Sequence, residues 1–145
     1  LAGGVAEVEE SVASVQEVHE AALLSQMMLP RVHAALLDGL RGKEDRTEPD
    51  ALGVVEGCDV AGTLVACDRA LKDADVSLSG LRLAVALGGR AYFVVAGFQH
   101  DVEAALQVAG AVLEERGALF RLESIPRPHA EMLPWLLRKP PFQLS

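Results

Sequence analysis

The chain has 145 residues and a formal net charge of −8. Half of its residues are apolar, but few of them are aromatic. The surplus of acidic side chains repels phosphate backbones, which argues against nucleic acid as a partner. No stretch approaches the roughly 20 apolar residues that cross a bilayer, and the Leu1 start carries neither a basic region nor a cleavage site, so membrane insertion and export are not indicated.

The first predicted elements are a helix and a charged connection. Val5 to Glu20 has the apolar spacing of a helix. Residues 39–50 (GLRGKEDRTEPD) are rich in charge and end in Pro-Asp, which is typical of a linker between folded units.

A buried strand and an amphipathic helix are predicted after this linker. Ala51 to Glu56 is a β-branched run that ends at Gly57, and Asp59 is placed to cap the following helix. The helix ends near Ala74, and its apolar residues recur on one face: Val60, Leu64, Cys67 and Leu71. The opposite face is expected to carry the charged residues Asp68, Arg69, Lys72 and Asp73.

The next predicted elements are a hairpin and a second helix. From Val76 the apolar alternation changes phase at Gly80, which indicates a strand that bulges there and runs to about Val85. Gly88-Gly89 suits a tight reversal into the strand Ala91–Ala96. A second amphipathic helix begins near Asp101 and stops at Gly117.

A last strand and a short helix complete the pattern. Ala118 to Ile125 reads as a strand that Pro126 and Pro128 prevent from continuing, and His129 to Leu137 as a short helix. The order β-α-β-β-α-β-α predicts an α+β domain.

Side chains with chemical potential are few and scattered. Cys58 and Cys67 are poorly spaced for a disulfide framework or a zinc site, and both are interpreted as reduced, buried residues. The four histidines show no catalytic or metal-binding spacing, so no catalytic residue, metal site or cofactor is predicted. His33 and His129, each placed just after a proline motif, are expected to cap short helices.

An internal repeat relates the two ends of the chain. Ala22–Leu37 aligns without gaps on Ala118–Leu133 at an offset of 96, with seven of sixteen positions identical. The helix over 5–20 matches the helix near Asp101 at an offset of 94. Residues 1–40 are therefore interpreted as the second half of another such domain, and about 50 or more further residues are expected before Leu1 because half a sheet buries too little surface.

The element Ile125-Pro126-Arg127-Pro128-His129, in this order of helices and strands, resembles the bacterial microcompartment shell domain. The segments ALGVVE (51–56), ALKDADV (70–76) and DVEAAL (101–106) match the same family at the expected spacings. The resemblance extends over Ala51–Leu137, and the PRVH of residues 30–33 stands where the family has PRPH. The chain thus resembles the tandem-domain subclass: a first domain's second half (1–40), a linker (41–50), a complete second domain (51–137) and a tail (138–145).

This resemblance implies a four-stranded antiparallel sheet with flanking helices and a structural, non-enzymatic role. Three tandem chains would imitate a six-domain ring, which would tile with other shell proteins, hexamers and pentamers, in a microcompartment shell of the bacterial cytoplasm. Small metabolites would pass through a central pore. No cofactor is implied, since relatives that hold an iron–sulfur cluster there use a pore cysteine that residues 84–90 lack.

The family also suggests functional positions. The tile edges map onto Lys72 and Arg127, whose alternative interpretation is ordinary solvated charge. The pore would be lined by the hairpin loop: Ala84, Val85, Ala86, Leu87, Gly88, Gly89 and Arg90. Three copies of Arg90 would attract anions, unless Gly88-Gly89 is merely a turn and Arg90 faces bulk water.

A second function stays open at this point. An oligomeric protein of ferredoxin-like fold could bind a small ligand between subunits and sense it, because such folds recur with unrelated functions. That role calls for a phosphate-cradling loop or a basic cluster at a helix N-terminus, and neither is present beyond Gly88-Gly89-Arg90.

Overall fold

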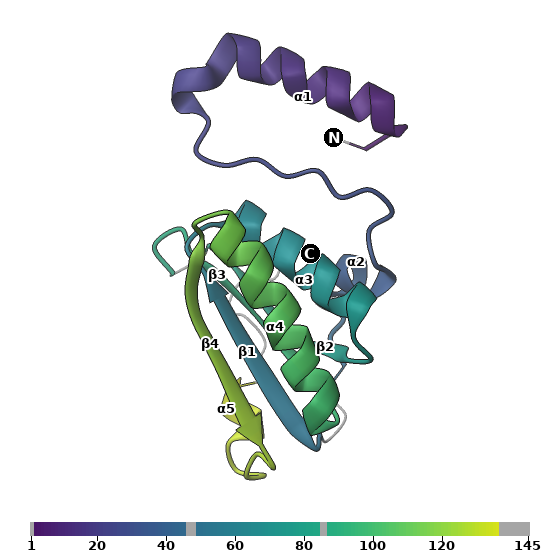
Figure 1. The fold of residues 1–145 in the computed structure, drawn as a ribbon, viewed down its shortest axis with the longest axis vertical. Coiled ribbons are helices and arrows are strands. Elements are labelled where there is room, and N and C mark those ends of the chain that lie inside the picture. Colours follow the sequence, from purple (N-terminus) through teal and green to yellow (C-terminus); the bar gives the residue numbers. More distant parts are fainter. Residues whose placement is uncertain (1, 46–48, 85–86, 137–145) are drawn as a thin grey trace.

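The computed structural model describes residues 2–45, 49–84 and 87–136. In chain order the elements are α1 (Val5–His19), the 3-10 helix η1 (Glu20–Ala22), α2 (Ala34–Leu40), β1 (Ala51–Gly57), α3 (Val60–Asp73), β2 (Ser77–Leu83), β3 (Ala91–Gly97), α4 (Gln99–Glu115), β4 (Leu119–Pro126) and α5 (Leu133–Leu136). The strands form one antiparallel sheet in the order β2-β3-β1-β4 (Figure 1). The predicted α+β fold with a four-stranded sheet and flanking helices is confirmed.

The core lies between the sheet and two long helices. Figure 1 shows α3 and α4 side by side over one face of the sheet. Phe93, Val95 and Leu113 are fully buried there. A smaller cluster on the opposite face joins Leu52 and Val94 to α5. Burial on both faces explains why β1 and β3 read as nearly continuous apolar runs rather than alternating ones.

Hydrogen bonds mark the start of α3 and the end of α4 at the residues that the sequence predicts. The Asp59 carboxylate accepts from the Gly62 N–H at 2.7 Å and caps α3, as predicted. At the end of α4, Gly117 has a φ of 63°, and the Ala118 N–H donates to the Leu113 carbonyl at 2.8 Å. This left-handed C-terminal motif is the glycine stop that the sequence indicated.

The hairpin strands differ slightly from their predicted bounds. The pairing of β2 with β3 shifts between Leu78 and Gly80, so the predicted bulge is confirmed. β2 ends at Leu83 rather than at about Val85, because the next residue, Ala84, turns away with a φ of 57°. Val85 itself lies outside the described residues.

Two side-chain predictions were wrong. Cys58 is exposed rather than buried, because it follows the last residue of β1 at the bend into α3. Asp68, expected among the solvated charges of α3, is only 3% exposed because a segment from outside the domain covers it. The last helix also begins later than predicted: α5 starts at Leu133, after a turn that His129 begins, and its predicted last residue, Leu137, lies outside the described residues.

The strand β1 and the helix α4 approach each other closely at Gly53. A Cβ atom placed on Gly53 would lie 2.9 Å from Val102 Cγ1 and 3.0 Å from Val95 Cγ2. A larger residue here would push α4 away from the sheet that it covers.

We expect Gly53→Ala to lower the free energy of unfolding by about 1–3 kcal/mol because of this overpacking. Gly80→Ala is the matched control, since a Cβ there would meet Val94 at 3.4 Å, which is close to ordinary contact distance. Urea unfolding of both variants measures the difference. Equal stability of the two would contradict the packing described.

The two cysteines should differ sharply in reactivity. Burial, together with the adjacent Asp68 charge, raises the pKa of the Cys67 thiol, whereas Cys58 is exposed. Titration of the native protein with a thiol reagent should label Cys58 within minutes and Cys67 only after denaturation. Cys58→Ser should therefore abolish native labelling.

Candidate functional site

The most distinctive contact in the molecule is made by the segment before β1. Residues 23–45, here called the docking strap, run between α1 and the sheet domain and then pack α2 against α3 and β2 (Figure 1). Leu36 is fully buried in this contact, and Gly39 packs so closely on Leu78 that a Cβ there would lie 2.5 Å from Leu78 Cδ2. The strap is therefore part of the core rather than a loose leader.

The start of the strap is tied to the ends of α3 and α4. The Ser25 hydroxyl donates to Asp59 Oδ1 at 2.6 Å, beside the N-terminus of α3. Arg116, at the end of α4, donates from Nη2 to the Gln26 carbonyl at 2.7 Å. Burial opposes ionisation of Asp59, but the Gly62 N–H, the Ser25 hydroxyl and the Arg116 charge outweigh it and lower the pKa of this carboxyl.

The middle of the strap is tied to a buried carboxylate. Asp68 Oδ1 accepts from the His33 N–H at 2.8 Å, and its other oxygen pairs with the Lys72 ammonium. Lys72 also donates to the Pro30 carbonyl at 3.3 Å. The Asp68 carboxylate is tolerated inside the protein because the backbone N–H and the ammonium satisfy it.

The end of the strap closes one edge of the sheet. Glu44 Oε1 accepts from the Leu81 N–H at 2.9 Å and from Arg82 Nη1 at 2.6 Å, and the Glu44 side chain is 2% exposed. The Asp45 N–H donates to the Leu78 carbonyl at 3.0 Å. The segment predicted as a linker thus begins as a clamp on β2, an edge strand whose free backbone groups would otherwise be open to another chain.

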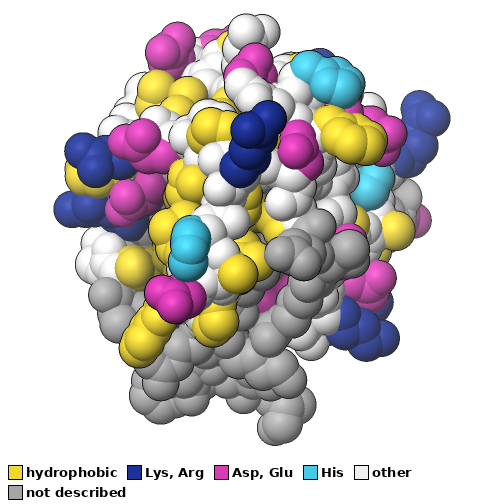
Figure 2. All heavy atoms as spheres, turned by 90° about the horizontal axis from the view of Figure 1, so that it is seen from below, with side chains coloured by type: hydrophobic (Ala, Val, Ile, Leu, Met, Phe, Trp, Pro, Cys, Tyr) yellow, Lys and Arg dark blue, Asp and Glu magenta, His cyan; other side chains and the backbone are white. Residues whose placement is uncertain are grey.

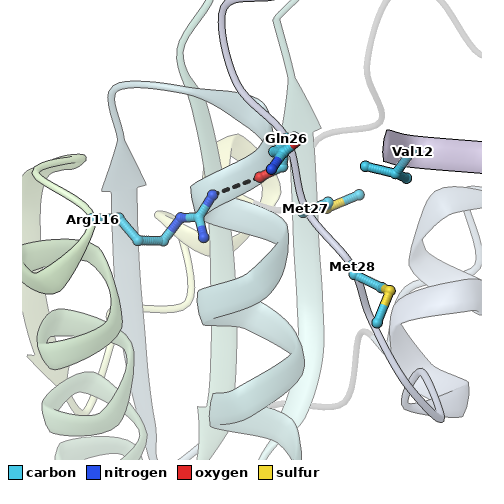
Figure 3. Close-up of a pocket in the computed structure, with 5 residues that line it drawn as sticks. All are labelled: Val12, Gln26, Met27, Met28 and Arg116. Carbon is cyan, nitrogen blue, oxygen red and sulfur yellow. Dashed lines mark hydrogen bonds between the residues drawn. The ribbon is translucent and has the colours of Figure 1, made fainter. Parts of the chain in front are cut away.

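A shallow hollow separates the strap from α1. Figure 3 shows its lining: Val12 from α1, the strap residues Gln26, Met27 and Met28, and Arg116. Arg116 is the one charged group of this lining, and it is bonded to the Gln26 carbonyl. These groups offer no acid, base or nucleophile for catalysis. Over the described ranges, no three His, Cys, Asp or Glu side chains gather as a metal ion requires.

The strap and the end of the sheet domain share unusual local geometry. Arg31 and Arg127, which are 96 residues apart, both adopt a positive φ, 52° and 48°. His33 Nδ1 accepts from the Ala35 N–H at 3.2 Å, and His129 Nδ1 accepts from the Glu131 N–H at 3.3 Å. The predicted capping role is confirmed for His33, which is the N-cap of α2, whereas His129 makes the equivalent hydrogen bond in a turn that precedes α5 rather than at its N-cap. The similarity of the two repeats thus extends to the backbone.

The two predicted edge residues have different surroundings. Lys72 is tied to the strap, with 29% of its side chain exposed. Arg127 directly follows the last residue of β4 and is exposed. Its N–H donates to the Asp50 carbonyl at 2.8 Å. Figure 2 shows this end of the molecule, where apolar side chains mix with single basic, acidic and histidine side chains.

The predicted pore loop is a tight reversal. The Ala84 N–H donates to the Arg90 carbonyl at 2.9 Å, and Gly88 and Gly89 have φ values of 62° and 87°. A Cβ added at either glycine would meet nothing within 4 Å, so their conformation, not crowding, requires glycine. Val85 and Ala86 lie outside the described residues.

The Arg90 side chain lies on the sheet. Its Nη1 is 3.3 Å from Glu56 Oε1, and its guanidinium carbon is 4.0 Å from the centre of the Phe120 ring. The Glu56 carboxylate and the face of the Phe120 ring thus both stabilise the Arg90 guanidinium, which the family resemblance had assigned to the pore.

Sequence reasoning gave no binding role to Asp68, Arg116 or Glu44. A weak signal existed for Asp68, which stands four residues before Lys72 and beside the apolar Cys67. Arg116 contacts a residue 90 positions away in the sequence, and Glu44 contacts one that is 37 positions away. No local sequence pattern can therefore predict these contacts.

Comparison with known proteins gives consistent results. Residues 51–128 match the family model described as the BMC domain. The chain is 36% identical over 132 residues to the bacterial microcompartment shell protein PduT of Citrobacter freundii, a match that covers 91% of this chain and 72% of that protein. A crystal structure of a microcompartments protein from Desulfitobacterium hafniense DCB superposes with a TM-score of 0.78 at 30% identity, covering 90% of this chain and 72% of that one.

The tie at Asp59 predicts an acid-sensitive strap. Because folding lowers the Asp59 pKa, its contribution to stability is complete above the unfolded value of about 3.9 and is lost as the pH falls through the lower, folded value. Between about pH 5 and pH 2, wild type should therefore lose more stability than Asp59→Asn, which keeps a capping side chain without the charge. Asp73→Asn removes one carboxylate from the same helix and serves as the matched control in the same urea unfolding series. A wild-type profile for Asp59→Asn would contradict the assignment.

Proposed function

Because the chain belongs to the bacterial microcompartment shell proteins, the family of the BMC domain, which is structural rather than enzymatic, we propose that it serves as a trimeric shell tile with a central pore. In this proposal each chain contributes two domains, and three chains close a ring of six. The observation that supports it is the docking strap, whose residues pack on α3 and β2 as the end of one domain would pack on the next.

The first forty residues supply the argument for two domains per chain. The apolar face of α1 is largely open to solvent, with Val5 55%, Val15 45% and Val18 72% exposed. At the offset of 94, Val15 corresponds to Ala109, which is fully buried against the sheet, and Val18 corresponds to Val112, which is half-buried. We infer that α1 covers a sheet of its own, whose opening strand, first helix and hairpin precede Leu1.

This assignment makes residues 1–40 the second half of the first shell domain. Residues 41–50 then connect it to the second domain, 51–137, and the tail 138–145 lies outside the described residues. In support, residues 23–29, which correspond to β4 at the offset of 96, form no strand here. In the complete domain β4 pairs with β1, and the chain contains no counterpart of β1 with which residues 23–29 could pair.

We place the pore at the hairpin loop, residues 84–90, with the three copies meeting about the ring axis. Gly88 and Gly89 would bring backbone N–H groups to the opening, where a permeating small metabolite meets them. The pairing of Arg90 with Glu56 reduces the attraction for anions that three free arginines would exert. Shape and backbone polarity then contribute more to selection than charge does.

We assign the tile edges to Lys72 and Arg127. Lys72 binds the carbonyl of Pro30, next to Arg31, which has the same backbone conformation as Arg127 at the equivalent repeat position. Basic groups thus recur where the two halves of the chain meet and at the exposed end of β4. The partners at these edges would be other shell proteins, hexamers and pentamers, in a shell within the bacterial cytoplasm.

The experiment that tests the tile is a mass and shape measurement on the tandem protein with both domains complete. Light scattering should give the mass of three chains, and negative-stain images should show six-lobed particles that form sheets. A monomer that never tiles with shell partners would contradict the proposal and would make ligand sensing the next function to test.

We predict that Arg127→Glu abolishes sheets without dissociating the trimer, because it replaces a basic group at the tile edge by a carboxylate in a chain whose net charge is already −8. Arg69→Glu is the control, since it makes the same charge change on the solvent side of α3, where Arg69 pairs with Asp73. Negative-stain counts of sheets and light scattering are the readouts. Loss of sheets in both variants would assign the effect to net charge.

A further inference from the structure

A second copy of the strap contact is the strongest unassigned feature of the surface. Extended along the chain, the repeat at an offset of 96 pairs the buried residues of α2, Leu36 and Gly39, with Met132 and Trp135. Trp135 is 76% exposed, the largest apolar side chain left open in the described part of the chain. An exposed indole at a position buried in the sister segment indicates a missing partner.

The short helices α2 and α5 have the same arrangement of buried and exposed faces. Leu133 of α5 packs on Leu52 and Val94 of its own sheet, and Trp135, two residues on, points to the other side of the helix. In α2 the equivalent of Leu133 is Leu37, which is 39% exposed, while Leu36 is fully buried against the neighbouring domain. Each helix therefore has one face for its own sheet and one face for a neighbour.

Resting on the trimeric tile proposed above, we propose that Trp135 is the residue that seats each subunit on the next. Residues 118–136 of one subunit lie on the α3–β2 face of the first shell domain of a second copy, as the strap lies on α3 and β2 here. Met132 takes the place of Leu36, and the indole of Trp135 enters the position of Gly39.

The close packing around Gly39 also bears on which α3–β2 face can accommodate the Trp135 side chain. A Cβ on Gly39 would lie 2.5 Å from Leu78 Cδ2 and 3.6 Å from Leu81 Cδ2, so a larger side chain at this position would require the Leu78 side chain to shift. That face is also already covered by its own strap. The proposal therefore requires a wider space at the corresponding position of the first domain, which would make the two contacts of the ring non-interchangeable.

Oxidative footprinting read by mass spectrometry tests the burial of Trp135. In the tandem protein at concentrations where it is trimeric, Trp135 should be labelled at least about tenfold more slowly than in the 145-residue chain. Phe98, which is 67% exposed on another part of the surface, is the internal control and should be labelled equally in both.

Truncation tests the energetic part. Trp135→Ala should raise the dissociation constant of the trimer at least about tenfold, as expected for a central aromatic anchor, with Trp135→Phe intermediate and Phe98→Ala unchanged. The melting temperature of the 145-residue chain should not fall with Trp135→Ala, because the indole is exposed there.

The outcomes separate the two proposals. A trimer in which Trp135 stays reactive, or which Trp135→Ala leaves intact, overturns the role of Trp135 and leaves the tile standing. Absence of any trimer overturns both.

Discussion

A buried carboxylate that accepts a backbone N–H from another segment is the constraint on which the rest of the molecule depends. Asp68 receives the His33 N–H and the Lys72 ammonium in the interior of the strap contact. A buried donor that loses its acceptor costs about 1–3 kcal/mol, so the strap has a strongly preferred position over α3. The burial of Leu36, the approach of Gly39 to Leu78 and the closure of the β2 edge all follow from that position.

The fold was largely predictable because its signals are local. The strands β1 and β3 are short apolar runs, and α3 and α4 carry both their periodicity and their caps within a few residues. What escaped prediction depends on residues far away in sequence. Asp68 looked solvated because nothing near it shows that residues 30–36 cover this part of α3, and Cys58 looked buried because the bend after Gly57 has no clear pattern.

The candidate site divides along the same line. Lys72, Arg127 and the hairpin loop followed from family motifs, whereas the contacts that surround them did not. The pairing of Arg90 with Glu56 and Phe120 arises from neighbouring strands of the sheet, β3, β1 and β4, whose registers no single segment encodes. Glu44 was included in a linker because its charged neighbours suggested solvent, although its carboxylate closes a sheet edge.

Several of the hydrogen bonds that hold the strap are made by its main chain rather than by its side chains. The Gln26 and Pro30 carbonyls and the His33 N–H form hydrogen bonds of this kind with side chains of α3 and with Arg116 at the end of α4. Mutations that exchange the side chains at such positions leave these partners in place. After a gene duplication, the two halves of such a chain are therefore free to drift apart in sequence while the joint between them keeps its geometry.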